Sequence, residues 1–429
     1  MPKPVTEAAD AMTADLAGVP AAEISPRGVS PLDNLAADLD LVRMRRERLA
    51  RVRTMMREHA LDALLLFDPY NQRYATGSRN MFGYFLRNSS RYIYVPAEGP
   101  VILFEYPGSA HVSTWLETID EARTSKVVFA AVNGRDHTVA TPFAQEIVSL
   151  LRRDTGDGRR VGMDRCFHLL ALALEREGVA VVDAMNLLLH TRRLKTRDEI
   201  ACLAQSMAAA ETAVWRVEQR LQPGVSENEL FAEMYHALIE GGGEFIETRL
   251  LTSGPKTNPW FHEAGERRVR PGELLALDTD CIGCHGYYAD FSRTFFCGPG
   301  RPSGYQRTLY RMACEQITHN AELLRPGMSF REIAERAWEI PPRFVDLRYP
   351  SIIHGVGMHG EKPIIAHSSE LDTYTGEGIL EENMVVSVES YIGEPGGNEG
   401  VKLENQYLVG PDGLVPMTRY PFDPDLLDD

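Results

Sequence analysis

The sequence contains no apolar run long enough to cross a membrane. A bilayer-spanning helix needs roughly 20 consecutive, mostly apolar residues, and no segment of the 429 residues approaches that length. The opening residues, MPKPVTEAADAMTADLAGVPAAEI, also lack the continuous apolar core of a signal peptide. We therefore expect a cytoplasmic protein that has no membrane partner.

Cysteine is scarce and scattered. The six cysteines are too few and too far apart for the disulfide framework of small secreted domains. Cys281 and Cys284 have the spacing of a zinc knuckle, but a structural zinc site needs a second pair of ligands, and no other C-x-x-C occurs. We interpret these two residues as buried strand thiols.

Positive charge is also in deficit. The chain has 45 Lys and Arg against 61 Asp and Glu, which gives a net charge of -16. Such a surface repels phosphate backbones and anionic lipids, so nucleic acid is not expected as a partner. Hydrophobic residues make up 44% of the sequence, enough at this length for two hydrophobic cores.

The order of helical and strand-like segments divides the chain at two points. Residues 1–36 are rich in Ala, Pro and Asp without periodicity, which predicts a loose arm. Residues 37–190 begin with a charged amphipathic helix and the apolar run 61–67, and strand-like and helical stretches then alternate as in an α/β domain. Residues 191–429 form the second predicted domain.

The second domain contains the clearest helix and a repeat. Thr196 and Glu199 form a capping box, and apolar residues follow at helical spacing as far as Leu221. The segment LQPGVSENEL at 221–230 returns as LRPGMSFREI at 324–333. Helix punctuation could reuse these residues by coincidence. The other interpretation is a duplicated α/β unit whose two halves face each other and enclose a cleft.

Three aspartates occur in a stretch that otherwise reads as two β-strands, LDTDCIGCHGYYADFSRTF at 277–295. Asp278 and Asp280 are two residues apart, so on a strand both side chains leave the same face, and a hairpin would bring Asp290 back towards them. Uncompensated carboxylates at close range repel each other and raise each other's pKa. A bound cation would remove this penalty.

Strands further along the chain supply three more potential ligands: His354 in SIIHGVGMHGEKPII, Glu389 in ENMVVSVES and Glu404 in GVKLENQYLV. Singly, each is more often a solvated carboxylate or a hydrogen-bonded structural histidine. Glu389, however, follows an apolar run where a central strand is expected, and buried carboxylates are rare without a partner. The whole set predicts a site for two divalent transition metal ions, of which Fe, Mn, Co or Zn suit oxygen-rich ligation with one imidazole.

These segments resemble the M24 metallopeptidase superfamily, through D...GYYADFSRTF, HGVGM, VVSVES, VKLEN and the helix opening RRLKTRDEI, over roughly residues 45 to 425. Members include methionine aminopeptidase, aminopeptidase P, prolidase and the metal-free creatinase. The resemblance implies a mixed α/β (α+β) protein with a creatinase-like N-terminal α/β domain and a C-terminal duplicated pita-bread domain.

Within the superfamily the chain looks most similar to the dimethylsulfoniopropionate lyase branch. The likeness lies in GGEFIETRLLTSGPKTNPWF, in LALDTD with its extra aspartate, in HGVGM..EKP and in YPFDP near the end. By this resemblance, the metal ligands of that branch fall on Asp278, Asp280, Asp290, His354, Glu389 and Glu404.

The sequence departs from that branch at three positions. The lyase motif is similar to HGVGLCDEWP, and its Asp is the proposed base. Here Gly360 takes that place, so either His359 takes over proton transfer or the substrate differs. The aromatic residue that packs against the sulfonium falls on Tyr84, a weaker cation-binding face than tryptophan. His262 stands near a substrate-binding histidine of M24 peptidases, where the lyases have glutamine. An ordinary polar contact is the alternative for both imidazoles.

The resemblance leaves two reactions open. As a lyase, the protein would remove a proton beside a carboxylate held by the metals and release a neutral group by β-elimination, with Tyr349 matching a tyrosine of that branch's site. As a dinuclear hydrolase, of the Xaa-Pro dipeptidase or aminopeptidase kind or a C-N hydrolase, Glu389 would accept a proton from water and His262 would steady the intermediate.

We favour the lyase, because the likeness extends through substrate-facing segments such as the one that contains Trp260. The resemblance further implies a homodimer in which Tyr84 and Arg87 of the first domain help to close the other copy's cleft. Some pita-bread domains have lost catalysis and only bind ligands. The complete ligand set argues against that third interpretation.

Overall fold

The structure is a computed structural model that describes residues 32, 38–127, 136–371 and 376–427. The predicted loose arm, residues 1–36, lies outside this range except for Leu32. The chain divides into two compact units, one of residues 40–192 and one of residues 193–429 with the described residues before Asp40. Each unit is described by itself.

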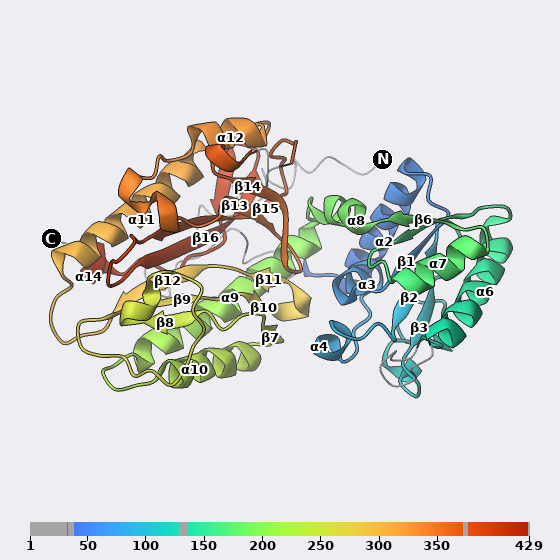
Figure 1. The fold of residues 1–429 in the computed structure, drawn as a ribbon, viewed down its shortest axis with the longest axis horizontal. Coiled ribbons are helices and arrows are strands. Elements are labelled where there is room, and N and C mark those ends of the chain that lie inside the picture. The colour runs from blue at the N-terminus through green and yellow to red at the C-terminus, as the bar shows by residue number, and fades with distance from the viewer. Residues whose placement is uncertain (1–31, 33–37, 128–135, 372–375, 428–429) are drawn as a thin grey trace. The chain divides into compact units, whose positions relative to one another are not determined.

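The unit of residues 40–192 is an α/β layer structure. Its six-stranded mixed sheet has the order β4-β3-β2-β1-β5-β6. Helices α6 and α7 cover one face, and α2, α3 and α8 lie on the other (Figure 1). The buried strands β1 to β3 are apolar on both faces for this reason. The helices are α2 (Leu41–Glu58), α3 (Pro69–Thr76), α4 (Phe82–Phe85), α6 (Asp136–Thr155), α7 (His168–Arg176) and α8 (Met185–Arg192); the strands are β1 (Ala63–Leu66), β2 (Tyr92–Pro96), β3 (Ile102–Glu105), β4 (Glu121–Thr124), β5 (Arg160–Met163) and β6 (Ala180–Asp183).

The other unit consists of two similar halves, and in Figure 1 its sheets lie between two pairs of helices. The first half has α9 (Arg197–Arg220) and α10 (Glu227–Glu240) with the sheets β12-β9-β8 and β11-β10-β7; the second has α11 (Gly304–Leu323) and α12 (Phe330–Arg336) with the sheet β14-β13-β15-β16-β17. Each half has a hydrophobic core of its own. The strands of these sheets are β7 (Phe245–Ile246), β8 (Leu251–Ser253), β9 (Leu274–Asp278), β10 (Cys281–Ile282), β11 (Tyr288–Ala289), β12 (Ser292–Phe296), β13 (Ser351–Val356), β14 (Gly360–Ala366), β15 (Val385–Ile392), β16 (Val401–Gly410) and β17 (Gly413–Pro416), and the last helix is α14 (Pro424–Leu427).

The sequence repeat corresponds to a repeated structure. In each copy the long helix ends at the repeat, and a glycine follows in a left-handed conformation, Gly224 with φ +91° and Gly327 with φ +90°. The N–H of each glycine is bonded to a segment further along the chain, at the carbonyl of Val269 and of Leu380 respectively. The serine of each copy then caps the next short helix. The repeat therefore reflects a duplicated unit, and the predicted pita-bread fold is confirmed.

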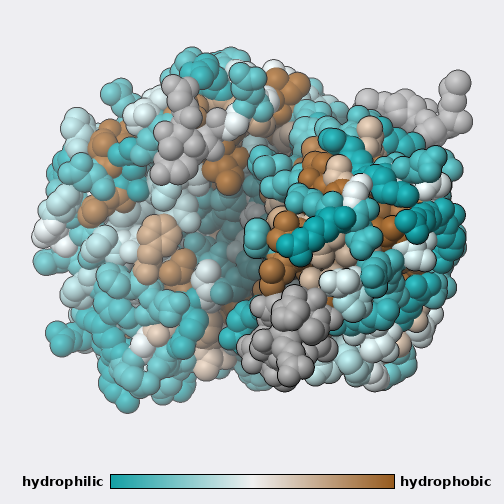
Figure 2. All heavy atoms as spheres, turned by 45° about the vertical axis from the view of Figure 1, so that its right-hand side comes forward, coloured by the Kyte–Doolittle hydropathy of each residue, from teal (hydrophilic) through white to brown (hydrophobic). Residues whose placement is uncertain are grey.

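The surface fits the composition. The face in Figure 2 is mostly hydrophilic, with hydrophobic residues in small scattered patches. Within the part of the chain that the structure describes, no helix has both the length and the apolar character to cross a membrane.

Candidate metal centre

The three aspartates lie in a bent hairpin. Strand β9 (Leu274–Asp278) pairs with β12 (Ser292–Phe296), and β10 (Cys281–Ile282) pairs with β11 (Tyr288–Ala289). Asp278 ends β9, Asp290 lies between β11 and β12, and Asp280 lies in the break between β9 and β10. The prediction that Asp278 and Asp280 share the face of one strand is therefore wrong. The two carboxylates instead come together because the chain turns between them.

Asp280 has an unusual backbone conformation. Its φ is +39°, a region that residues with a side chain rarely adopt. Two neighbours hold its carboxylate: the Tyr288 hydroxyl donates to Oδ1 at 2.5 Å, and the Thr248 hydroxyl donates to Oδ2. A strained conformation persists only where the surroundings impose it, and such residues concentrate at functional sites.

A second prediction about this hairpin is wrong in part. Cys281 is a buried thiol on β10, as expected. Cys284 is only half-buried and opens a 3-10 turn (Cys284–Gly286), because the strand ends at Ile282. Both cysteines are free thiols.

The other three predicted ligands lie on neighbouring strands of the second half: His354 on β13 (Ser351–Val356), Glu389 on β15 (Val385–Ile392) and Glu404 on β16 (Val401–Gly410). Glu389 and Glu404 are directly opposite each other in the β15–β16 register. Like charges in that arrangement destabilise a sheet. Something must therefore compensate the two carboxylates.

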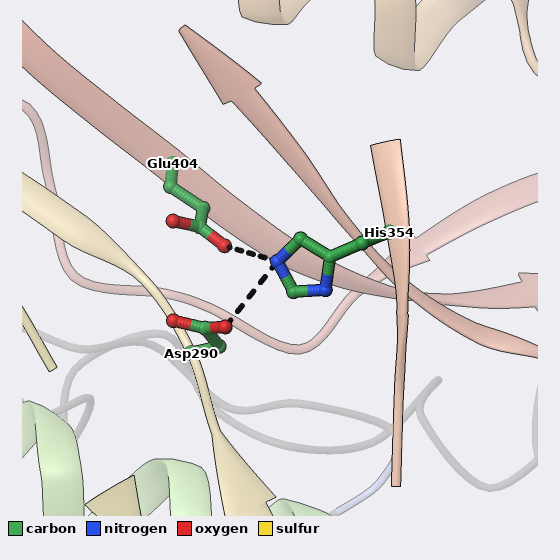
Figure 3. Close-up of side chains that lie close together, drawn as sticks. All are labelled: Asp290, His354 and Glu404. Carbon is green, nitrogen blue, oxygen red and sulfur yellow. Dashed lines mark ion pairs between the residues drawn. The ribbon is translucent and has the colours of Figure 1, made fainter. Parts of the chain in front are cut away.

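The six side chains converge where the two halves meet. His354 Nε2 lies 3.3 Å from Asp290 Oδ2, from Glu389 Oε1 and from Glu404 Oε1, and Figure 3 shows the imidazole facing two of these carboxylates. Potential ligand atoms lie within 4.8 Å of one another in two groups, Asp290 with His354 and Glu404, and Asp278 with Asp280 and Asp290. Asp290 belongs to both groups. The arrangement thus offers closely spaced ligand atoms of the kind that could hold divalent metal ions.

Unsatisfied atoms support this interpretation. Among the described residues, Asp290 Oδ1 and Glu404 Oε1 are buried oxygens that accept no hydrogen bond. Buried polar atoms in native proteins almost always have a partner, and an ion is one explanation for an exception. Carboxylate oxygens with a single imidazole suit the divalent transition metals Mn, Fe, Co and Zn. The residues present therefore fit the implied metal ions.

The pKa values of the three aspartates also agree with a metal site. Burial, followed by the neighbouring carboxylates, raises the pKa of Asp280 to about 7 and raises the pKa of Asp290 well above its ordinary value. Burial also raises the pKa of Asp278 to about 6, even though the nearby Lys402 acts in the opposite direction. The surroundings of each carboxylate thus disfavour its ionised form. A cation would reverse this effect.

Sequence reasoning missed Lys402, which lies on β16. Its side chain is fully buried, and Nζ lies 2.7 Å from Glu404 Oε2 and 3.0 Å from Glu389 Oε2. Burial alone would raise the pKa of Glu404, but the charges of Lys402 and His354 lower it to about 2. The segment VKLEN could have revealed this lysine, because Lys402 and Glu404 are two residues apart and such residues share one face of a strand.

Tyr349 and Trp260 lie beside the cluster. The ring centroid of Tyr349 is 4.5 Å from Lys402 Nζ, and burial together with nearby carboxylates such as Glu389 raises the pKa of the Tyr349 hydroxyl well above its usual value. Trp260 is buried and packs in one small apolar cluster with Tyr391, with Tyr349 at its edge. Trp260 thus supports the wall that contains Tyr349.

His359, predicted to transfer a proton, and His262, predicted to steady an intermediate, do not belong to either converging group. His262 is exposed, and its Nδ1 lies 2.9 Å from the Lys256 carbonyl. His359 is half-buried in the turn between β13 and β14, directly before Gly360. Tyr84 on α4 and the nearby Arg87 belong to the other unit. Their roles stay predictions.

Comparisons with known proteins agree with the fold and the site. Residues 201–411 match metallopeptidase family M24, and residues 48–194 match the creatinase/prolidase N-terminal domain. The chain is 34% identical over 394 residues to dimethylsulfoniopropionate lyase DddP of Roseovarius nubinhibens, covering 90% of this chain and 88% of that protein. It is 28% identical to an Xaa-Pro dipeptidase of Pyrococcus furiosus over 53% of this chain and 64% of the dipeptidase.

A solved structure extends the likeness across both units. The Xaa-Pro dipeptidase from Bacillus anthracis superposes with a TM-score of 0.71 over 88% of this chain and 99% of the dipeptidase, at 19% identity. At that identity the match concerns the fold alone. Taken with the sequence relatives, these findings show that the chain belongs to the metallopeptidase family M24 and has a creatinase-type N-terminal domain.

Proposed function

We propose that this protein is a metal-dependent lyase that cleaves a small, betaine-like carboxylated substrate such as dimethylsulfoniopropionate by β-elimination. The observation that supports this most is the 34% identity to a dimethylsulfoniopropionate lyase over 90% of the chain, since it runs through both units and is not confined to the metal site. In this proposal the two ions are held by Asp278, Asp280, Asp290, His354, Glu389 and Glu404.

Divalent ions in this site would polarise the substrate carboxylate and thereby acidify the adjacent C–H. The tasks left to the chain are to hold the substrate and to accept the proton. Tyr349, which packs beside the cluster, would orient the substrate. A base then removes the C–H proton, the C–H electrons form the double bond, and the C–S bond breaks with its electron pair leaving on sulfur. The products are an unsaturated carboxylate, a neutral sulfide and the proton on the base.

The base of this mechanism is assigned to the turn between β13 and β14. The position that carries aspartate in the resembling branch is Gly360, at the start of β14. Its neighbour His359 is the residue of this turn that has a basic side chain, and we assign the proton to it. Histidine is a common general base in enzymes.

Restoring the aspartate tests the proposal directly. Gly360 has no positive φ, and a Cβ added there would meet no atom within 4 Å, so Gly360→Asp is accommodated without strain. We expect the metal-loaded variant to release dimethyl sulfide from dimethylsulfoniopropionate about 10-fold faster than the parent, since a carboxylate at the position of the base in the resembling branch would add to proton transfer by His359. Headspace gas chromatography measures the product.

Gly304→Asp is the matched control. Gly304 is likewise exposed, lacks a positive φ and has open space around a Cβ, but it lies at the start of α11. It should leave sulfide release unchanged. Xaa-Pro dipeptides are assayed in parallel. If the parent cleaves them, and neither parent nor Gly360→Asp releases sulfide, the protein is a hydrolase and the proposal is wrong.

A further inference from the structure

Lys402 contacts ligands of both candidate metal positions. Its side chain is completely buried, and besides the two glutamates its Nζ lies 3.6 Å from Asp278 Oδ2. Asp278 belongs to the group of three aspartates, and Glu404 belongs to the group with His354. The Lys402 ammonium group is therefore close to carboxylates of both groups.

In Glu389 and Glu404, the two oxygens of each carboxylate have different partners. Glu389 and Glu404 each direct Oε2 to Lys402 Nζ, at 3.0 and 2.7 Å. Each directs Oε1 to His354 Nε2, at 3.3 Å. One oxygen of each carboxylate is thus held by a cation of the chain itself. The other oxygen, Oε1, faces the imidazole and is the one directed towards the ion site; in Glu389 it also accepts from the Ser351 hydroxyl at 3.2 Å, and in Glu404 it accepts no hydrogen bond.

The ammonium group has little freedom to move away. Besides the carboxylates, the ring of Tyr349 lies 4.5 Å from Nζ, within the range of a cation–π contact. The aliphatic stem is fixed as well, because β16 and β12 are bonded at this residue: Lys402 N donates to Thr294 Oγ1, and that hydroxyl donates back to the Lys402 carbonyl. The charge is fixed in position by the fold.

The charge balance explains why a lysine is tolerated in a metal site. With all five carboxylates ionised, the cluster and the ammonium together carry four negative charges, which two divalent ions cancel. Without the ions, Lys402 is the nearest compensation for the two glutamates that face each other across β15 and β16. Uncompensated like charges at this range would strongly oppose folding.

We propose that Lys402 is a positioning residue that restricts Glu389 and Glu404 to one metal-facing oxygen each and holds the cluster together before the ions bind. This inference relies on the metal centre of the proposed function but not on its lyase chemistry. Lys402 itself touches no substrate. It sets the number of oxygens that the ions receive.

Co²⁺ is the probe, because the intensity of its visible d–d bands falls as its coordination number rises. In Lys402→Met both Oε2 atoms become available, so we expect weaker bands per bound ion than in the parent. Co²⁺ affinity by titration calorimetry should rise about tenfold or more, since a fixed positive charge near the ions is removed. The thermal midpoint of the ion-free variant should fall, and Co²⁺ should restore it. Lys402→Arg keeps the charge and should keep the parent's spectrum.

Lys195→Met is the matched control. Lys195 is also buried and forms an ion pair with a buried glutamate, Glu361, at 3.0 Å, but Glu361 belongs to neither converging group. Its loss should lower the midpoint with and without Co²⁺ equally and leave the spectrum unchanged. Should Lys402→Met require Co²⁺ to fold, its spectrum is measured on protein purified with the ion.

The outcomes distinguish a failure of this proposal from a failure of the metal centre or of the lyase activity. The proposal is overturned if Lys402→Met binds Co²⁺ with the parent's affinity and spectrum. A parent that binds no Co²⁺ refutes the metal centre as a whole and this proposal with it. A parent that binds two Co²⁺ ions but releases no sulfide contradicts the lyase alone, and the expected spectral change in Lys402→Met would still support the role of Lys402.

Discussion

At the residue scale, the site depends on a few side chains whose surroundings oppose their charge. Asp290 is the one that belongs to both converging groups. It is fixed through its backbone, where its N–H donates to the Gln406 side chain at 3.0 Å and its carbonyl accepts from the Ser387 hydroxyl at 3.1 Å. Both partners lie on strands of the second half, so the hairpin of the first half is held against them.

Asp290 belongs to both groups, so in the proposed two-ion centre its replacement should affect both ions. In Asp290→Asn the amide has the same shape but provides only one neutral oxygen, which is a weak ligand. We expect the number of tightly bound divalent ions per chain to fall from two to one or none, measured by inductively coupled plasma mass spectrometry after dialysis. Asp346→Asn, an exposed carboxylate in the turn before β13, should keep two. An unchanged stoichiometry in Asp290→Asn would contradict the shared position.

Residue patterns predicted much of this cluster, and they failed where the backbone departs from regular geometry. His354, Glu389 and Glu404 could be found because each lies inside an apolar strand-like run. The break after Asp278 could not, since Asp280 adopts a left-handed conformation that depends on Tyr288 and on tertiary packing. Strand alternation does not predict this break, so it could not give the backbone positions of the two aspartates.

At the element scale, the start of α9 is connected to the site hairpin. The Thr196 hydroxyl accepts from the N–H of Glu199, and Glu199 Oε2 accepts from the N–H of Thr196, which completes the capping box. Glu199 Oε1 also accepts from the buried Tyr287 hydroxyl at 2.9 Å. The capping box was predictable from spacing. The bond to Tyr287 was not, because it joins residues 88 positions apart.

Because Glu199 both completes the capping box and accepts from Tyr287, replacing Glu199 should cost more stability than replacing Thr196. Thr196→Ala removes one cap and should destabilise the unit that contains α9 by about 1 kcal/mol. Glu199→Ala also removes the acceptor of a buried hydroxyl, which should add about 1–3 kcal/mol. Chemical denaturation monitored by hydrogen exchange in this unit measures both. Ser303→Ala, at the equivalent capping box of α11, should resemble Thr196→Ala. Equal losses for Thr196→Ala and Glu199→Ala would show that the Tyr287 bond contributes nothing.

The repeat also shows what local sequence can and cannot specify. The segments beginning at Leu221 and Leu324 share helix-ending and helix-starting residues, which was enough to predict duplication. The sheets of the two halves differ, since the first half has two three-stranded sheets, β12-β9-β8 and β11-β10-β7, and the second has one five-stranded sheet, β14-β13-β15-β16-β17. That difference arises from long-range pairing, for which the repeated residues carry no information.

At the scale of the whole molecule, the converging carboxylates found among the described residues all lie in the unit of residues 193–429. Any ligand that binds the folded form alone stabilises it by mass action. The ions should therefore stabilise the unit of residues 193–429 directly, while residues 40–192 gain nothing from ligation. The unit of residues 40–192 has its own core and its own buried polar network, in which Arg91 is paired with Glu105.

Removing the ions should consequently have a local effect that hydrogen exchange can resolve by peptide. At a free ion concentration of 100 times Kd, binding adds about 2.7 kcal/mol to the free energy of global opening of the ligating unit. We expect chelation by EDTA to speed exchange in the peptides of β9, β12, β15 and β16 and to leave those of β1 to β3 unchanged. Asp290→Asn should show the faster exchange with or without EDTA. An equal change in both units would mean that the ions act on the whole chain, and no change in either would mean that the carboxylates do not bind them.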